Sequence, residues 1–256
     1  MDRPCALITG ATAGLGAEFA NQLAASGHDL VLVARNAERL KQRAVQLTER
    51  YGVDVQVIPA DLTDPAGLAK VEARVRAAER PVSILVNNAG YGLLGQFERN
   101  SVEQEEHHLA LHVRATLRLM HAALQQMLPR RAGTILNVAS VAGFTPRGSY
   151  GAAKAWVLSF SRWANWYYKS RGVQVSAVAP GFVHTEFHSR MGARKEQIPG
   201  FLWLDAPRVV RTALDDARRG KAVSVPSLRY KLIVAFTKML PTSLVAAGSL
   251  TARPTD

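Results

Sequence analysis

The chain has one cysteine, Cys5, and therefore cannot form an internal disulfide bond. Cys5 lies in a short apolar run, where a buried structural thiol is the ordinary expectation. The sequence also lacks the cysteine and histidine spacings that bind zinc, so we expect no metal site. The apolar run begins close to the N-terminus, so no signal peptide is expected, and with the lone thiol this predicts a cytoplasmic protein.

Long apolar stretches are missing too. The most apolar C-terminal segment, residues 228–240, is short and contains three basic side chains, whereas a membrane-spanning helix needs about 20 apolar residues. We expect this segment to form an amphipathic helix that packs on the domain. Alternatively, the helix could contact a partner subunit or lie on an anionic membrane surface. Beyond it, residues 248–256 are expected to form a loose tail.

Charge is unbalanced but not clustered. The formal net charge is +12, yet the chain has no run of five or six basic residues and no nucleic-acid-binding motif. We therefore predict a basic surface suited to anionic small molecules, and no nucleic-acid partner. A length of 256 residues with 48% hydrophobic side chains fits a single α/β domain of six or seven strands over residues 1–256.

A glycine-rich segment follows the first apolar run. Cys5-Ala-Leu-Ile-Thr9 predicts a buried strand, Gly10-Ala-Thr-Ala-Gly14-Leu-Gly16 follows at once, and helical periodicity begins at Ala17. Glycines let a backbone approach a pyrophosphate, and a helix N-terminus offers free N–H groups to it. The Gly-x3-Gly-x-Gly spacing is a variant of the dinucleotide fingerprint. A helix start with merely flexible glycines is the alternative.

The second predicted strand, residues 29–34, ends at Arg35. Dinucleotide-binding folds have an acidic residue here to bind the adenosine ribose, or an arginine to bind a 2′-phosphate. Arg35 therefore favours NADP(H) over NAD(H), with a solvated arginine as the alternative. Further strands are predicted at residues 53–58, 84–86, 134–138, 173–178 and 222–226. Strands that alternate with helices predict a doubly wound parallel sheet with helices on both faces, as in the Rossmann fold.

Tyr150 and Lys154 are the most informative pair in the chain. They are four residues apart, and on a helix that spacing places two side chains on one face. A free tyrosine titrates near ~10, and a neighbouring cation favours its phenolate. The pair therefore suits general acid–base catalysis. A tyrosine and a lysine at this spacing also occur by chance, so the motif gains its weight from the rest of the chain.

Five landmarks in order resemble the short-chain dehydrogenase/reductase family, in its Thr-Gly-x3-Gly-x-Gly and Tyr-x3-Lys branch. They are the segment 9–16, Asp61, the segment Asn87-Asn-Ala-Gly90, Ser140 with Tyr150 and Lys154, and Pro180-Gly181. Together they span residues 5 to about 190. The resemblance implies an NADP(H)-dependent oxidoreductase that interconverts a carbonyl and a secondary alcohol. A cofactor-binding regulatory or scaffold protein that has lost efficient turnover is the alternative.

The resemblance also assigns roles. Tyr150 would be the general acid in reduction and the base in oxidation, Ser140 would bind the substrate oxygen, and Lys154 would lower the pKa of the tyrosine and bind the nicotinamide ribose. Asp61 would meet the adenine edge, and Thr185 the nicotinamide carboxamide. The candidate cofactor-binding positions are Thr9, Gly10, Thr12, Ala13, Gly14, Leu15, Gly16, Arg35, Asp61, Leu62, Asn88, Ala89, Gly90, Tyr150, Lys154, Pro180, Gly181, Val183 and Thr185.

Two features depart from the family pattern. His112 falls where the family has an asparagine that completes a catalytic tetrad, so we count His112 as a catalytic candidate. Imidazole can donate and accept hydrogen bonds and adds its own pH dependence; a shifted register that leaves His112 facing solvent is the alternative. Ser140 and Tyr150 are ten positions apart, fewer than is usual in the family. The shorter loop leaves Asn137 and Ser149 as weaker substitutes for Ser140.

The remaining expectations concern substrate and assembly. In this family the segment that corresponds to residues 186–207 forms a substrate lid, and its apolar residues predict a carbonyl or alcohol substrate with a hydrophobic body. The helix predicted over residues 156–168 is rich in aromatic residues, which argues for burial on two sides. Family members commonly associate through this helix and the one that holds His112, so we predict a homodimer or homotetramer.

Overall fold

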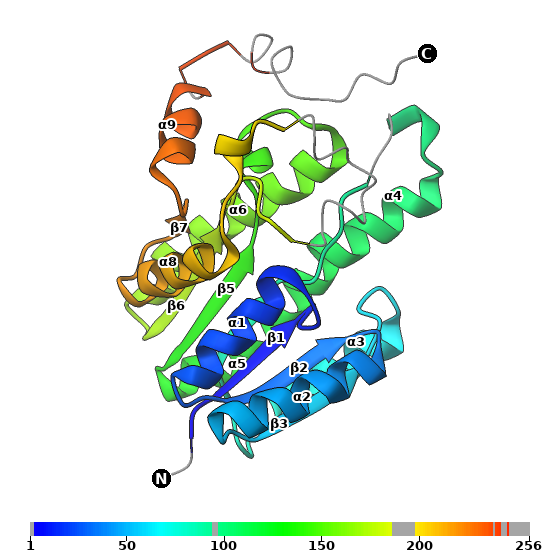
Figure 1. Cartoon of the computed structure of the whole chain (residues 1–256), viewed down its shortest axis with the longest axis vertical. Coiled ribbons are helices and arrows are strands. Elements are labelled where there is room, and N and C mark those ends of the chain that lie inside the picture. Colours follow the sequence, from blue (N-terminus) through cyan, green and yellow to red (C-terminus); the bar gives the residue numbers. More distant parts are fainter. Residues whose placement is uncertain (1–2, 94–96, 186–197, 238, 242–244, 246–256) are drawn as a thin grey trace.

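The sheet at the centre of the molecule has seven parallel strands. A computed structural model describes residues 3–93, 97–185, 198–237, 239–241 and 245. The strand order is β3-β2-β1-β4-β5-β6-β7, and every neighbouring pair is parallel (Figure 1). The strands are β1 (Cys5–Thr9), β2 (Asp29–Ala34), β3 (Val55–Pro59), β4 (Val82–Asn87), β5 (Gly133–Val138), β6 (Val173–Val178) and β7 (Val223–Ser224).

Helices follow the strands in alternation. The α-helices are α1 (Gly14–Ala25), α2 (Ala37–Tyr51), α3 (Pro65–Arg76), α4 (Val102–Leu109), α5 (Thr116–Arg130), α6 (Gly148–Lys169), α8 (Ala206–Arg218) and α9 (Leu228–Thr237). Shorter helical elements are the 3-10 turns η1 (Phe97–Arg99), η3 (Val141–Phe144) and η5 (Gly200–Leu202), and the π-helical turn η2 (Ala110–Ala115). The π-helical turn continues α4 directly into α5.

Side chains of each strand alternate between two hydrophobic layers. In β1, Cys5 and Leu7 belong to one buried cluster, while Ala6 and Ile8 belong to another. The first cluster includes apolar residues of α3, α5 and α6, and the second includes those of α1, α2 and α8. Because both faces are covered, the central strands are mostly apolar, with buried polar exceptions such as Asn87, Asn137 and Ser176. The predicted fold, a doubly wound parallel sheet with helices on both faces, is confirmed.

Local sequence signals explain where several helices begin and end. The Asn36 side chain accepts a hydrogen bond from Arg39 N and caps α2, which ends at Gly52 in the left-handed conformation. Ser101 and Gln104 form a capping box at the start of α4. The predicted boundaries differ mainly at the edge strand: β7 has two residues, where the sequence predicts a strand over residues 222–226.

The order of the strands creates the position for a site. From β1 the chain continues outward to β2 and β3 and then returns to β4 on the other side of β1. The connections after β1 and β4 therefore leave the sheet in opposite directions, and a crevice opens at the carboxyl ends of these strands. The glycine-rich segment, Asn88 and the residues after β5 and β6 all follow those carboxyl ends.

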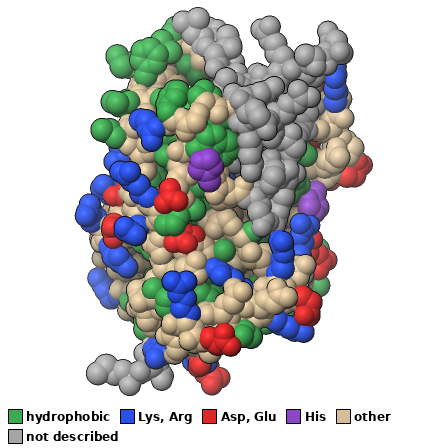
Figure 2. Space-filling model, viewed as in Figure 1, with side chains coloured by type: hydrophobic (Ala, Val, Ile, Leu, Met, Phe, Trp, Pro, Cys, Tyr) green, Lys and Arg blue, Asp and Glu red, His purple; other side chains and the backbone are tan. Residues whose placement is uncertain are grey.

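The helix α9 packs on the domain through one side only. Tyr230 and Val234 are buried, and the Tyr230 hydroxyl donates to Leu202 O and accepts from Phe182 N. The other sides leave Leu228, Leu232 and Phe236 more than 60% exposed. Figure 2 shows apolar side chains at the upper left, where Figure 1 draws α9, and interspersed basic and acidic side chains below. No helix of the described residues has the length and apolar character to cross a membrane.

Candidate active site

The glycine-rich turn between β1 and α1 has the geometry of a phosphate cradle. Gly10 and Gly14 adopt positive φ angles of 67° and 56°, which favour glycine. A Cβ atom on Gly16 would lie 2.2 Å from Gly10 O, so only glycine fits there. The turn therefore leaves its backbone exposed to a ligand at the start of α1, where the free N–H groups attract an anion.

Thr9 and Asn88 hold this turn against the end of β4. The Thr9 hydroxyl accepts hydrogen bonds from Asn88 N (2.9 Å) and Ala89 N (3.0 Å). The Asn88 amide donates to Thr9 O and Gly10 O. The side chains of these two predicted cofactor-binding residues are thus used to fix the shape of the turn. Leu62 is another predicted cofactor-binding residue. Its side chain is buried in the core and therefore faces away from the crevice.

Arg35 and Asp61 lie together at the ends of β2 and β3. Arg35 Nη1 is 4.0 Å from Asp61 Oδ2, and the arginine side chain is 75% exposed. Burial works to raise the pKa of Asp61, but two hydrogen bonds from Thr63 and the charge of Arg35 hold it below its usual value. An ionised carboxylate and an accessible guanidinium therefore lie side by side at the carboxyl ends of β2 and β3.

Tyr150 and Lys154 lie in the first two turns of α6, which begins at Gly148 and so includes both residues of the motif. The Lys154 ammonium is 5.8 Å from the centre of the Tyr150 ring and donates to Val138 O at 2.7 Å. Ser140 hydrogen-bonds to the Tyr150 hydroxyl and also accepts from Ala142 N. The short loop thus keeps Ser140 beside Tyr150. Asn137 is fully buried and bonded to Asn87 and Ser161, so it cannot substitute for Ser140.

Burial dominates the protonation of this pair. It raises the pKa of Tyr150 to about 12, although the Ser140 hydrogen bond and the charge of Arg147 act in the opposite direction. It also lowers the pKa of Lys154 to about 7. Burial thus outweighs the other influences on both groups in the chain alone, and the role of Lys154 in lowering the tyrosine pKa stays a prediction. At neutral pH the phenol of the free chain is therefore protonated.

His112 lies beside this pair, buried in the π-helical turn. It is 2% exposed, which excludes the solvent-facing alternative, and its ring is 5.7 Å from that of Tyr150. Its Nε2 atom is 2.7 Å from Tyr91 O. A Cβ atom on Gly90 would lie 2.5 Å from His112 Cε1, so this glycine leaves room for the imidazole. The catalytic role of His112 stays a prediction.

The segment after β6 closes the crevice opposite α6. Pro180 O accepts a hydrogen bond from Val141 N, and a Cβ atom on Gly181 would collide with the Tyr230 ring. Val183 pairs with Leu204, and Thr185 lies against Gly14. The structure therefore brings the predicted nicotinamide contact to the glycine-rich turn. Residues 186–197 of the predicted lid lie outside the described residues, as does the tail 248–256; residues 200–202 form η5 and Ala206 begins α8.

Three further side chains near the crevice have no counterpart in the predictions. They are Tyr91, Glu105 and His108. His108 is fully buried with its ring 4.4 Å from that of His112 and 5.9 Å from that of Tyr150. Its spacing of four from His112 is the one signal that the sequence contains for it. Among the described residues there is no group of three or more His, Cys, Asp or Glu side chains that could hold a metal ion.

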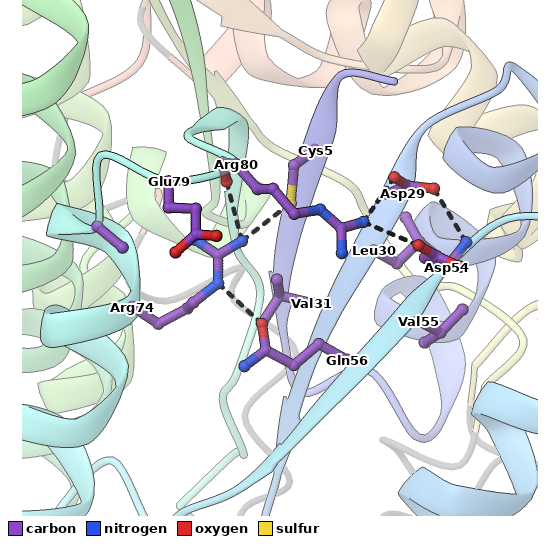
Figure 3. A pocket seen from close by; sticks show the side chains of 11 residues that line it. Cys5, Asp29, Leu30, Val31, Asp54, Val55, Gln56, Arg74, Glu79 and Arg80 are labelled. Atoms are coloured by element: carbon purple, nitrogen blue, oxygen red, sulfur yellow. Dashed lines mark hydrogen bonds and ion pairs between the residues drawn. The ribbon is translucent and has the colours of Figure 1, made fainter. Parts of the chain in front are cut away.

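A hollow of about 480 Å³ lies at the opposite edge of the sheet, at the amino ends of β1, β2 and β3 (Figure 3). Its polar side chains bond to one another: Arg80 forms ion pairs with Asp29 and Asp54, and Arg74 donates hydrogen bonds to Gln56 and Cys5. Burial raises the pKa of the Cys5 thiol, which keeps it unreactive. We therefore regard this hollow as structural.

Comparison with known proteins agrees with the geometry. The family model described as short chain dehydrogenase matches residues 4–196. The chain is 31% identical over 201 residues to 3-oxoacyl-[acyl-carrier-protein] reductase FabG of Aquifex aeolicus, covering 75% of this chain and 81% of that protein.

Two solved structures resemble the whole fold. A short-chain dehydrogenase from Sphingobium yanoikuyae in complex with NADPH has a TM-score of 0.84 and 37% identity, covering 92% of this chain and 94% of that one. The bulky-bulky ketone specific alcohol dehydrogenase from Comamonas testosteroni has a TM-score of 0.80 and 33% identity over 100% of both chains. The likeness therefore extends well beyond the motifs to the C-terminal region.

Proposed function

The chain belongs to the short-chain dehydrogenase/reductase family, whose members exchange a hydride between NAD(P) and an alcohol or carbonyl group, and we propose that it is an NADP(H)-dependent reductase of ketones. The observation that carries the proposal is the cluster that Ser140, directly after β5, forms with Tyr150 and Lys154 of α6. When bound, NADPH supplies the hydride, and the protein supplies orientation and a proton.

Each side chain of the cluster has a distinct task. The Tyr150 hydroxyl, which is protonated at neutral pH, donates its proton to the carbonyl oxygen. Ser140 hydrogen-bonds to the same hydroxyl and thereby holds it where the substrate oxygen must come. Lys154 would bind the nicotinamide ribose of the coenzyme, and in its charged form it would stabilise the phenolate that remains.

The preference for NADP(H) rests on Arg35. Its exposed guanidinium lies directly after β2. Proteins that bind NAD(H) have an acidic residue at this position, which binds the ribose. A 2′-phosphate placed there would gain a charge-assisted contact with the arginine. The structure from Sphingobium yanoikuyae, with its bound NADPH, supports the same coenzyme.

The substrate class follows from the walls of the crevice after β6. Phe182 and Trp203 lie with their rings 5.9 Å apart, and His184 stacks on Trp203 at 4.7 Å. These rings offer apolar surface beside Thr185. The similarity to the ketone-specific alcohol dehydrogenase from Comamonas testosteroni points the same way. We therefore propose a ketone with a hydrophobic group on each side of the carbonyl.

The proposal is tested by two measurements on the purified chain. Fluorescence titration is expected to show tighter binding of NADPH than of NADH. The absorbance of NADPH is then expected to fall when ketones with two bulky apolar substituents are added. If the chain binds neither coenzyme, the proposal is contradicted and the regulatory alternative is favoured. The hydrogen bond between Ser140 and Tyr150 argues against that alternative, because an inactive scaffold has no need of this bond.

We also propose that the chain is cytoplasmic and that it forms a homodimer or homotetramer. The interface would include α6. Trp163, Trp166 and Tyr167 are 45%, 78% and 46% exposed, and Trp163 stacks on Tyr167 at 5.2 Å. Exposed aromatic clusters of this kind are typical of interfaces. Light scattering is expected to give at least twice the monomer mass, and Trp166→Glu is expected to yield monomers; a monomeric parent at micromolar concentration would refute the proposal.

A further inference from the structure

Exposed apolar side chains are concentrated around the C-terminal helix α9. Among the described residues, fourteen large apolar side chains are exposed, and five of them fall within residues 228–239. Figure 2 shows apolar side chains gathered on this part of the molecule. We call these five, which are between 41% and 82% exposed, the α9 patch: Leu228, Leu232, Ile233, Phe236 and Met239. Single exposed apolar residues are ordinary, whereas a group of this kind indicates an interaction surface.

The geometry of α9 separates the patch from the side of the helix that packs on the domain. Leu228, Leu232 and Phe236 are spaced by four residues and therefore share one face of the helix. Tyr230 and Val234, which are buried, lie on the opposite face at 3.6 residues per turn. The domain therefore holds α9 by one face and leaves the apolar opposite face to a partner.

The charge around the patch has one sign. Arg229 and Lys231 are exposed on the same helix, and between Asp216 and Asp256 the sequence has seven basic residues and no acidic one. An anionic surface is complementary to such a segment. A second copy of the chain is a poor occupant, because in a two-fold interface the patch would face itself. The basic side chains of both copies would then meet with no carboxylate from this segment between them.

The patch adjoins the crevice in which we place the substrate. The Tyr230 hydroxyl on the inner face of α9 donates to Leu202 O and accepts from Phe182 N. The Arg229 side chain donates to Phe201 O. Phe201 is itself 64% exposed, so apolar surface continues from α9 to η5. The aromatic wall after β6 is thus bonded to the helix that has the patch.

We propose that the α9 patch docks on an anionic phospholipid bilayer and that the ketone substrate enters the crevice from that bilayer. The apolar side chains of the patch lie at the level of the upper acyl chains, and Arg229 and Lys231 meet the lipid phosphates. An apolar ketone concentrates in lipid, so an entrance at the membrane surface meets more substrate than one in water. The substrate part rests on the reductase function proposed above; the docking part does not.

The docking test is co-sedimentation of the full chain with vesicles of phosphatidylcholine, alone or mixed with phosphatidylglycerol. The chain is expected to bind the mixed vesicles at least about 10-fold more tightly, since each basic residue near an anionic surface contributes about fivefold. Leu232→Glu is expected to weaken this binding at least about 10-fold, because it removes a buried leucine and adds a repelled carboxylate. Lys231→Gln is expected to weaken it about fivefold. Val45→Glu, at an exposed apolar residue of α2, is the matched control and should bind like the parent.

Docking is refuted if the parent ignores phosphatidylglycerol, or if Leu232→Glu and Val45→Glu bind the mixed vesicles equally well. Light scattering without lipid examines the other occupant: a smaller assembly in Leu232→Glu than in the parent would show that the patch contacts a second copy, and would overturn the proposal. NADPH affinity within about twofold of the parent shows that a variant is folded. Lys231→Gln changes an exposed side chain and keeps the test decisive if Leu232→Glu does not fold.

Entry from the bilayer is tested with an apolar ketone dissolved in the mixed vesicles and with a small ketone dissolved in water. Leu232→Glu is expected to lower kcat/KM for the ketone in vesicles at least about 10-fold, and to leave kcat/KM for the ketone in water within about twofold. Equal changes for both ketones would contradict entry from the bilayer. If the parent reduces neither ketone, the reductase function fails, whereas the vesicle binding of the parent and its variants still decides the docking.

Discussion

Tyr150→Phe is expected to lower kcat for ketone reduction by about 10³-fold while NADPH affinity changes less than about threefold. The substitution removes one hydroxyl and leaves the ring, so packing against His108 and His112 is kept. What is lost is the proton donor that Ser140 holds in position. General acid catalysis contributes about 10² to 10⁴ to a rate, and among the described residues no other hydroxyl has the same neighbours.

The control for this experiment is Tyr51→Phe at the end of α2. Tyr51 is far from the crevice, with Arg50 over its ring at 5.2 Å, so the loss of its hydroxyl should leave kcat unchanged. Turnover is followed by NADPH absorbance, and binding by fluorescence. If Tyr150→Phe keeps more than a tenth of the parent kcat, Tyr150 is not the acid.

The same tyrosine sets the pH dependence of the two directions. Burial raises the pKa of Tyr150 to about 12 in the free chain, so the phenol is the dominant form across the neutral range. Reduction consumes the protonated form and is expected to fall as the pH rises through the pKa of the loaded site. Oxidation needs the phenolate and is expected to rise over the same range.

The sequence predicts the fold and the position of the crevice because both depend on local patterns. Apolar runs such as 5–9 and 29–34 become the strands β1 and β2 with the predicted bounds. Edge strand β7 is shorter than predicted because only two of its residues pair with β6. A run of alternating valines carries no information about how much of it finds a partner.

The site is less predictable because burial and helix geometry decide it. Nothing in the residue types around Lys154 shows that its ammonium is desolvated enough to lower its pKa to about 7. The π-helical turn η2 also has no sequence signal, yet it sets how His112 faces Gly90 and Tyr91. His108 was missed for this reason: a histidine next to another on an acidic helix resembles a solvated side chain until its burial is known.

Arg35→Asp is expected to reverse the coenzyme preference. It removes the guanidinium that would bind the 2′-phosphate, and charge-assisted hydrogen bonds contribute about 1.5–3 kcal/mol each. The affinity for NADPH should therefore fall by about 10-fold to 100-fold, since about 1.4 kcal/mol corresponds to tenfold. The new carboxylate can accept hydrogen bonds from the ribose of NADH, so binding of NADH is expected to be unchanged or tighter.

Arg50→Asp separates local recognition from net charge, because both substitutions change the charge of the chain by the same amount. Arg50 lies at the far end of α2, about 20 Å along the helix from Arg35 at 1.5 Å per residue. That distance exceeds the screening length of about 8 Å at physiological ionic strength. Fluorescence titration of both variants with both coenzymes decides the matter. Equal losses of NADPH affinity would show that the basic surface as a whole attracts the coenzyme. A loss confined to Arg35→Asp would show that the end of β2 selects NADP(H) through one guanidinium.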